Sequence, residues 1–268
     1  MSPLALPPAI DVLGTPLTPT TYGELLARIQ EHAGQDQGHP VGLSFANTHI
    51  VSLRRADKSF RQVTASVDHF LPDGMPLVWC LNRAGAQLRD RVYGPAFMRH
   101  AMENARPGQT HYLLGGSPEC GALLRERAAV EWPHFRIVGS YHGRCSDAGI
   151  LGASVAEDEA VWEELERLRP DCVWIGMGPT KQYVWMARAK QRLGRGVFLS
   201  VGCAFDMHAG LQKDAPPWMQ RAGLTWLYRI FHEPRRLAGR YVRYNTLFLL
   251  QILRQWIAPA HTAEAAED

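Results

Sequence analysis

Three polar side chains suited to chemistry lie between Gly42 and Gly94. Asn47 and Asp73 each follow a short apolar run that is typical of a buried strand, and Arg91 follows further along. Polar loops at the carboxyl ends of parallel strands are where an open α/β sheet holds its ligand. We therefore expect an amide, a carboxylate and a cation to face one crevice.

Asp73 has two interpretations. The residues Pro72-Asp73-Gly74 are typical of a turn. An aspartate in such a sequence more often stabilises a turn or caps a helix than takes part in catalysis. As a functional group, Asp73 would be a general base that takes the proton of an attacking hydroxyl group. The residue types alone leave both interpretations open.

Glycines at two predicted strand ends could let backbone amides approach a phosphate. Gly176 and Gly178 precede Lys181 and Gln182 at the expected start of a helix, where amide groups bind phosphate. The pair Gly115-Gly116 follows another strand. Tight turns explain both pairs equally well. The GxGxxG dinucleotide fingerprint is absent, because Lys181 occupies the third glycine position, and there is no Walker A motif.

The histidines and acids do not predict a metal site. None of the eleven histidines pairs at HxxxH or HExxH spacing, and no DxD pair follows a strand. The nearest approach to such a pair is Asp206-Met207-His208. Without a divalent ion, the charge on a leaving group would be met by Arg91, Lys181 or arginines near the C-terminus.

Strands and helices that would position these groups alternate along the chain. Expected strands cover 41–45, 63–71, 111–116, 136–143, 171–178 and 196–202. Expected helices cover 51–62, 75–88, 93–105, 157–168 and 182–192, with two more beginning near Thr20 and Ser117. This alternation predicts an α/β fold with a mainly parallel sheet flanked by helices.

The C-terminal region differs in composition from the rest. Between 221 and 254 there are seven arginines and one acid, Glu233, a net charge of +6, whereas the whole chain carries +3. Glu233-Pro234 separates two amphipathic helices, and the second carries a predicted apolar stripe from Leu237 to Ile252. These helices could simply pack on the core, or they could lie on anionic lipid.

Composition limits the class of protein. A length of 268 residues with 46% apolar residues suits one medium domain with an appendage. We predict a core over 1–212, a basic amphipathic helical appendage over 213–257 and a disordered tail over 258–268. The small net charge argues against nucleic acid as a partner. No apolar run reaches the roughly 18–20 residues of a spanning helix, and no secretory signal is evident.

The five cysteines have neither zinc-site nor redox spacing. Cys80, Cys172 and Cys203 lie in apolar runs, so we expect them to be buried thiols in a reducing cytoplasm.

Taken in order, the motifs of this chain resemble the WecG/TagA/CpsF family of bacterial glycosyltransferases (glycosyltransferase family 26), over roughly residues 8–250. The residues that carry the resemblance are Asn47, Pro72-Asp73-Gly74, Arg91-Val92-Tyr93-Gly94, Leu113-Leu114-Gly115-Gly116, Tyr141-His142-Gly143, 176–182 with Trp185-Met186, 201–206, 215–218, 226–229, 233–236 and Arg240-Tyr241.

The resemblance implies inverting, metal-independent transfer of a hexose-type sugar from a UDP-sugar to a polyprenyl-diphosphate-linked saccharide, in bacterial surface or exopolysaccharide synthesis. It also implies a Rossmann-like core and a membrane-binding appendage that helps complete the active site. Asp73 matches the family's proposed base, Arg91 and Gln182 match its proposed pocket residues, and Asn47 matches the polar strand-end site.

Further expectations follow from the same resemblance. We expect Gly115, Gly116, Gly176, Gly178, Lys181, Gln182 and Asp206 to bind the nucleotide sugar. We expect Arg229, Arg235, Arg236 and Arg240 to meet the diphosphate and an anionic membrane surface. The protein would then be peripheral on the inner face of the cytoplasmic membrane, with no cofactor. Its oligomeric state is left open, and a homo-oligomer is compatible with the sequence.

Three departures from the family pattern leave the donor sugar open. Phe45 stands where many members have threonine, Pro95-Ala96 replaces an acidic position, and Cys203 replaces a glycine. Members use UDP-linked N-acetylmannosamine, its uronic acid or glucose. The alternative function is a non-catalytic nucleotide-binding assembly or regulatory protein on the same scaffold. A dehydrogenase is disfavoured, because neither GxGxxG nor a catalytic Tyr-x-x-x-Lys is present.

Overall fold

The computed structural model describes residues 4–36, 38–142 and 159–257. Within them lies an eight-stranded sheet with the strand order β1-β2-β4-β3-β8-β7-β5-β6. The strands are β1 (Ile10–Val12), β2 (Thr15–Leu17), β3 (Val41–Ala46), β4 (His69–Pro72), β5 (Thr110–Gly115), β6 (Arg136–Tyr141), β7 (Cys172–Gly176) and β8 (Val197–Ser200). Every neighbouring pair is parallel except the β1–β2 hairpin, which confirms the predicted α/β class. Cys145 and the predicted tail over 258–268 lie outside the described residues.

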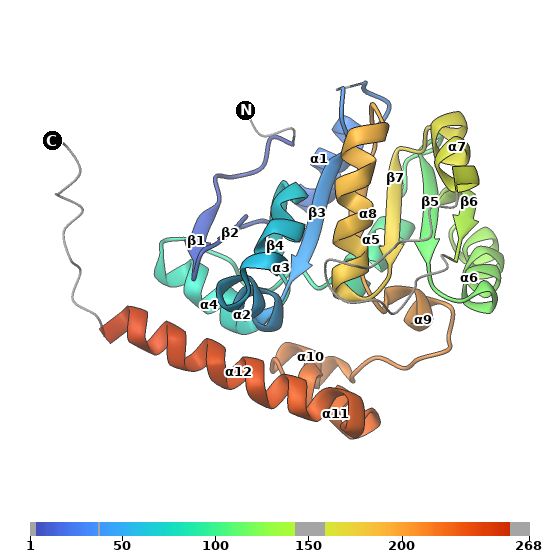
Figure 1. The fold of residues 1–268 in the computed structure, drawn as a ribbon. Coiled ribbons are helices and arrows are strands. Elements are labelled where there is room, and N and C mark those ends of the chain that lie inside the picture. The colour runs from blue at the N-terminus through green and yellow to red at the C-terminus, as the bar shows by residue number, and fades with distance from the viewer. Residues whose placement is uncertain (1–3, 37, 143–158, 258–268) are drawn as a thin grey trace, which may run out of the picture.

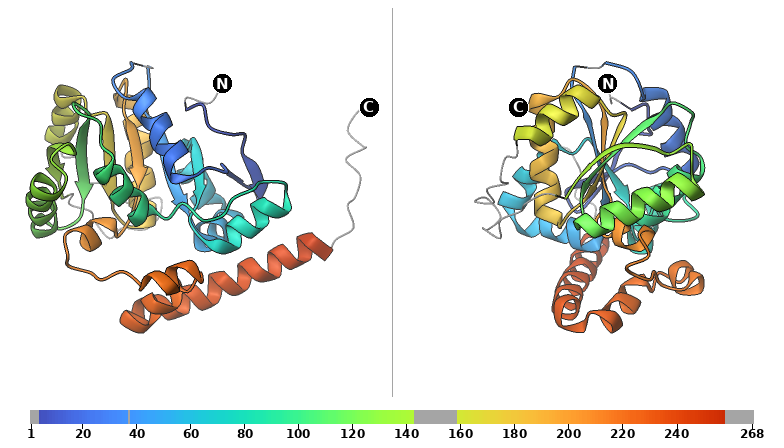
Figure 2. Two further views of the ribbon diagram at one scale, coloured as in Figure 1. Left: turned by 180° about the vertical axis from the view of Figure 1, so that it is seen from behind. Right: turned by 90° about the vertical axis from the view of Figure 1, so that its right-hand side faces the viewer.

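Helices cover both faces of this sheet (Figures 1 and 2). One face holds α1 (Tyr22–His32), α5 (Gly94–Glu103), α6 (Pro118–Glu131) and α9 (Ala204–His208). The other holds α2 (Thr48–Ala56), α3 (Lys58–Val63), α4 (Met75–Arg83), α7 (Glu159–Leu168) and α8 (Pro179–Arg192). Successive side chains of β7 point to opposite faces of the sheet. Trp174 packs in the core beneath α1, α5, α6 and α9, whereas Val173 and Ile175 pack in the core beneath α7 and α8.

Two predicted element boundaries were wrong between β3 and β4. The helix expected over 51–62 is divided, because the Asp57 carboxylate accepts hydrogen bonds from the amides of Ser59 and Phe60, at 2.8 and 3.1 Å, and starts α3. The strand expected over 63–71 begins only at His69. A short 3-10 turn, η1 (Thr64–Ser66), precedes it, and Thr64 Oγ1 donates to the Phe60 carbonyl at 2.9 Å.

The last three helices lie across the edge of the sheet where β3 ends (Figure 1). They are α10 (Pro217–Arg221), α11 (Thr225–His232) and α12 (Pro234–Ile257). Helix α12 packs along α2: Thr48 Oγ1 donates to Asn245 Oδ1 at 2.8 Å, and Ser52 Oγ donates to the Tyr244 carbonyl at 3.2 Å. Despite the length of α12, none of the described helices is apolar enough over a sufficient span to cross a bilayer.

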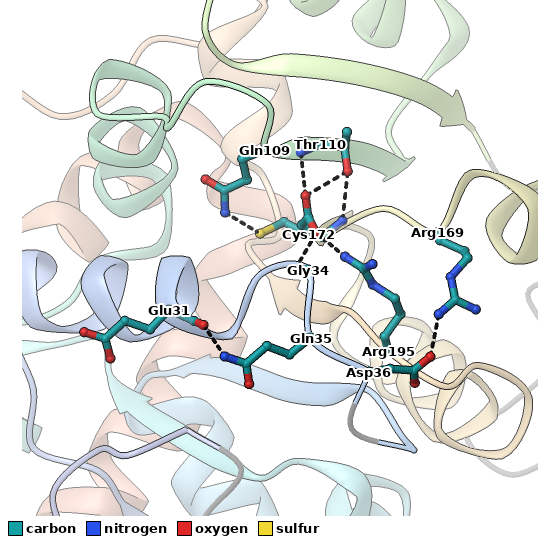
Figure 3. Close-up of polar contacts among 10 residues, drawn as sticks. Glu31, Gly34, Gln35, Asp36, Gln109, Thr110, Arg169, Cys172 and Arg195 are labelled. Carbon is teal, nitrogen blue, oxygen red and sulfur yellow. Dashed lines mark hydrogen bonds and ion pairs between the residues drawn. The ribbon is translucent and has the colours of Figure 1, made fainter.

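The opposite edge of the sheet is closed by a polar network around Asp171, which directly precedes β7. Its carboxylate accepts hydrogen bonds from the Gly34 amide at 2.9 Å, the Thr110 amide at 2.9 Å and Thr110 Oγ1 at 3.0 Å. Arg195 adds an ion pair to the same carboxylate. Gly34, Thr110 and Arg195 converge from three separate segments (Figure 3), so this network ties those segments together.

Candidate active site

A cavity of about 320 Å³ opens at the carboxyl ends of four adjacent strands, β4, β3, β8 and β7. Its lining includes Asn47, Asp73, Gly176, Gly178, Gln182, Asp206 and Arg229 from the predicted set, together with Phe45, His49, Ile50, Tyr93, Pro95, Met177, Ser200, Val201, Gly202, Cys203 and Gln212. The position matches the crevice where open α/β sheets bind ligands. Arg229 comes from α11, so the C-terminal helices contribute to the wall.

Asp73 is placed in this cavity by backbone contacts on both sides. Its amide donates to the Ala46 carbonyl at 2.8 Å, which holds it beside the end of β3. The Val92 amide donates to the Pro72 carbonyl at 2.9 Å, which brings the segment with Arg91 alongside. Helix α4 has Gly74 at its N-cap and no side-chain cap. The carboxylate of Asp73 therefore lines the cavity and does not cap the helix.

Burial dominates the electrostatics of Asp73. Loss of hydration raises the pKa of its carboxyl group to about 6, and Asp214 acts in the same direction. The nearby charges of Arg91 and Arg229 and a hydrogen bond from the Gly94 amide oppose that rise. A carboxylate with a pKa near neutrality can accept a proton from a substrate and release it to solvent, as a general base requires.

Arg91 adjoins Asp73 but is not among the residues that line the cavity. Its side chain is buried, with 8% of the residue exposed. Arg91 Nη2 donates to Thr225 Oγ1 of α11 at 2.8 Å, and the guanidinium carbon lies 4.5 Å from the centre of the Tyr93 ring. The expected crevice thus contains Asn47 and Asp73, while Arg91 lies outside its lining, and its charge lowers the pKa of the Asp73 carboxyl group.

The two amide side chains, Asn47 and Gln182, both face the cavity. Asn47 Oδ1 accepts a hydrogen bond from the Ile50 amide at 3.2 Å, so this residue also caps α2. Gln182 is 7% exposed, and its Oε1 has no hydrogen-bond partner among the described residues. A buried acceptor of this kind is unfavourable unless a donor reaches it.

The two glycine pairs, expected either to approach a phosphate or to form tight turns, differ in position. Gly176 and Gly178 line the cavity at the start of α8, where amides can bind an anion. Gly115 and Gly116 are outside the lining. Gly115 has a φ of +110°, and a Cβ there would lie 2.7 Å from the Gly176 carbonyl, so it is needed for the close approach of two strand ends. Lys181, in the first turn of α8, is also outside the lining.

Of the four arginines predicted to meet a diphosphate, Arg229 lines the cavity. Its guanidinium contacts the Cys203 sulfur. Arg235 is exposed in the first turn of α12, away from this lining. The side chains of Arg236 and Arg240 lie outside the described parts of the structure.

Two further residues of the cavity differ in their surroundings. Cys203 is half-buried, not buried as its apolar neighbours predicted, because it follows β8 at the cavity wall. Asp206 lines the cavity from α9 and also hydrogen-bonds with Cys120.

Several residues of the site were not predicted. His49 and Gln212 line the cavity, and Tyr93 Oη donates to Asp214 Oδ1 at 3.2 Å, which joins the core to the segment before α10. Thr225 reaches Arg91 from α11. Tyr93 belongs to a motif that was singled out, but a single threonine in a C-terminal helix carries no signal in one sequence.

Among the residues that the structure describes, no group of three or more His, Cys, Asp or Glu side chains converges as metal ligands would. Asp73 and Asp206 are the two carboxylates of the lining.

The fold and the cavity define an α/β protein with a carboxylate, that of Asp73, in a cavity at the carboxyl edge of a mainly parallel sheet. A family model described as "Glycosyl transferase WecG/TagA/CpsF family" matches residues 10–262. The chain therefore belongs to this family and is a glycosyltransferase, which confirms the resemblance seen in its motifs.

Named relatives agree with this assignment. The N-acetylglucosaminyldiphosphoundecaprenol N-acetyl-beta-D-mannosaminyltransferase of Staphylococcus aureus strain MRSA252 is 23% identical over 229 residues, which are 85% of this chain and 86% of that protein. The protein of the same name from strain MW2 is 22% identical over the same shares.

Proposed function

We propose that this glycosyltransferase moves a hexose-type sugar from a UDP-sugar to a polyprenyl-diphosphate-linked saccharide, with inversion and without a metal ion. The observation that carries the proposal is Asp73, a half-buried residue in a cavity at the strand ends, where loss of hydration raises the pKa of its carboxyl group to about 6. The names of the relatives, which specify a lipid-diphosphate acceptor and an N-acetylmannosaminyl group, support the substrate class. Synthesis of bacterial surface polysaccharide is the process in which such a product would be used.

In the proposed reaction, the acceptor hydroxyl oxygen attacks the anomeric carbon of the donor sugar. A new C–O bond forms on the face opposite UDP while the bond to the diphosphate breaks, so the configuration inverts. The hydroxyl proton passes to Asp73, and UDP leaves with the bonding electron pair. A positioned general base typically contributes about 10²–10⁴-fold to such a rate.

The departing diphosphate carries the developing negative charge. Arg229 and the backbone around Gly176 and Gly178 line the same cavity and can meet that charge through a guanidinium group and helix-terminal amides. Gln182 Oε1 can accept a hydrogen bond from a sugar or base. Arg91, outside the lining, is assigned to the base and not to the diphosphate.

The acceptor is attached to a lipid, so the enzyme must work at a membrane surface. We propose that 213–257 is a membrane-binding appendage of a core spanning 1–212. Helix α12 has two apolar faces: Leu237, Phe248 and Ile252 are buried. A second set is exposed, namely Val242, Leu249, Leu250, Leu253 and Ile257. An exposed apolar stripe flanked by arginines is typical of a helix that lies in a lipid interface.

Reconstitution tests the transfer reaction. Purified protein is incubated with UDP-N-acetylmannosamine, its uronic acid or UDP-glucose and a polyprenyl-diphosphate N-acetylglucosamine acceptor, with excess chelator. We expect one donor to give a disaccharide lipid and free UDP, detected by mass spectrometry. UDP binding without transfer across the whole panel would instead support a non-catalytic nucleotide-binding protein. Activity that disappears with chelator and returns with a divalent ion would contradict metal independence.

Vesicle sedimentation tests the membrane proposal. The double variant Leu249→Glu/Leu253→Glu places two charges on one face of α12, because residues four apart lie on the same side of a helix. We expect it to lose most binding to vesicles that contain phosphatidylglycerol. The matched control is Val130→Glu on α6, where the valine is 82% exposed. Equal loss in both variants, or in neither, would contradict the assignment of this face.

A further inference from the structure

Arg91 is a buried cation near Asp73. The Val92 amide donates to the Pro72 carbonyl at 2.9 Å, which brings the two backbone segments side by side, and the charge of Arg91 lowers the pKa of the Asp73 carboxyl group. The guanidinium is held by Thr225, the first residue of α11, which is 5% exposed and accepts the 2.8 Å hydrogen bond from Arg91 Nη2. The Tyr93 ring lies against the guanidinium, 4.5 Å from ring centre to guanidinium carbon. This arrangement joins a residue of the C-terminal helices to the arginine whose charge acts on Asp73.

We propose that Thr225 is a positioning residue that holds the Arg91 guanidinium beside Asp73 and thereby keeps the base in its carboxylate form. This inference rests on the proposed function, in which Asp73 is the general base. The role differs from binding of the diphosphate, because Arg91 is not among the residues that line the cavity. It also gives α11 an effect on catalysis that is separate from the contact of Arg229 with the cavity.

The physical reason is the hydrogen-bond geometry of arginine. A guanidinium group is planar and donates in fixed directions, so a partner at one nitrogen determines where the charge lies. A cation within about 4–6 Å of a carboxylate lowers its pKa by roughly 1–3 units. Loss of the Thr225 hydroxyl group would leave a buried donor of Arg91 unsatisfied, and the guanidinium would move to find another acceptor.

Other ionisable groups also face Asp73 or its cavity. They are Arg229 from α11, Asp214 from the segment before α10, Asp206 from α9, Tyr22 from α1, Tyr93 from the segment before α5, Cys203 from the turn after β8, and His49 from α2. Burial raises the pKa of Tyr22 to about 12 and also raises the pKa values of Tyr93 and Cys203. These three groups stay neutral near pH 6, so they would not imitate the titration of Asp73.

The experiment compares wild type with Thr225→Val, which removes the hydroxyl group at nearly constant shape, and Thr225→Ser, which retains it. Ser52→Ala is the matched control, because it removes another hydrogen bond to the C-terminal helices without touching Arg91. For each protein, kcat/KM is measured from pH 5 to 9, and UDP affinity is measured by calorimetry at pH 8. A carbon-13 NMR titration of the Asp73 carboxyl group, assigned with Asp73→Asn, follows protonation without requiring turnover.

We expect the acid limb of kcat/KM for Thr225→Val to move up by about one pH unit. Its kcat/KM would fall about fivefold at pH 6 and hardly change at pH 8. Thr225→Ser and Ser52→Ala are expected to keep the acid limb of wild type. UDP affinity of Thr225→Val is expected to stay within about twofold, and the NMR titration should show the same shift as the rate.

Four results would overturn the proposal. The first is that neither the acid limb nor the NMR titration moves in Thr225→Val, and the second is that Ser52→Ala shows an equal shift. The third is that Thr225→Val loses the same fraction of kcat/KM at every pH. The fourth is that Thr225→Val loses much of its UDP affinity, which would make Arg91 a diphosphate ligand. Failure of the proposed function looks different: Asp73→Asn would keep full activity, or wild type would show no transfer. In that case an NMR shift in Thr225→Val would still support the positioning contact, and its absence would reject it.

Discussion

Each end of the sheet holds an aspartate near an arginine, but Asp171 is buried whereas Asp73 is half-buried, and the two aspartates have different surroundings. At the amino end, Asp171 accepts hydrogen bonds from Gly34 and Thr110 and pairs with Arg195. At the carboxyl end, Asp73 accepts one from the Gly94 amide, and its cavity also holds a glutamine oxygen with no partner among the described residues.

The difference lies in how many hydrogen-bond donors compensate each carboxylate for the water that it loses on folding. Several donors around Asp171 replace the water that burial removed, so its charge is satisfied within the fold. Asp73 also loses hydration, but fewer hydrogen-bond donors replace the lost water, and the pKa of its carboxyl group rises to about 6. An arginine neighbour alone therefore does not identify a functional aspartate. The better indicator is whether the hydrogen-bond donors around the carboxylate compensate for the hydration that it loses.

The largest effect should come from Asp73→Asn. We expect the transfer rate to fall by about 10²–10⁴-fold, because the amide cannot accept the proton of the acceptor hydroxyl group. The folded protein should become more stable at pH 8, by about 1–3 kcal/mol, because the variant no longer buries a charge whose folded pKa is raised. Single-turnover kinetics and denaturant unfolding measure the two quantities.

The same substitution at the opposite end, Asp171→Asn, should act in the other direction on stability. It removes the charge that pairs with Arg195, and breaking a buried ion pair typically costs about 3 kcal/mol. The transfer rate per folded molecule should stay near that of wild type, because Asp171 lies at the far edge of the sheet. Urea unfolding at pH 8 gives the stability, and activity is normalised to the folded fraction.

Together these two variants test whether Asp73 and Asp171 have different roles. If both lowered stability and left the rate unchanged, Asp73 would be a structural residue like Asp171. If Asp171→Asn lowered the rate as strongly as Asp73→Asn while the protein stayed folded, the amino end of the sheet would also belong to the active site.

A smaller effect should appear in the pH dependence of wild type. A base must be ionised to act, so kcat/KM should decline as pH falls through the pKa of about 6 for Asp73. At pH 5 the rate should be about tenfold below its plateau. Stability should change in the opposite sense: between pH 6 and 4 the folded state binds the proton more tightly than the unfolded chain, so this group makes unfolding harder as pH falls. An acid limb near pH 4 would contradict the raised pKa.

Much of the fold followed from local patterns. Alternating apolar runs and amphipathic segments predicted the parallel sheet, and Ser117 with Pro118 marked the start of α6 correctly. The error after α2 arose because Asp57 caps a new helix, a side-chain hydrogen bond that competes with the helical pattern of its neighbours. The apolar stripe predicted on α12 was incomplete, because the helix carries a second apolar face that is exposed.

The amino-acid sequence is sufficient to define the class of the protein and the chemical groups available to it. Motif order placed the chain in its family, and strand-end loops pointed to Asn47 and Asp73. Tertiary structure alone decided which of those groups share a cavity. It left Arg91 outside the cavity lining and joined it to Thr225, more than a hundred residues away in the chain. Side chains so distant in sequence meet only because sheet and helix packing bring their elements together, and the burial that raises the pKa of Asp73 arises from the same packing.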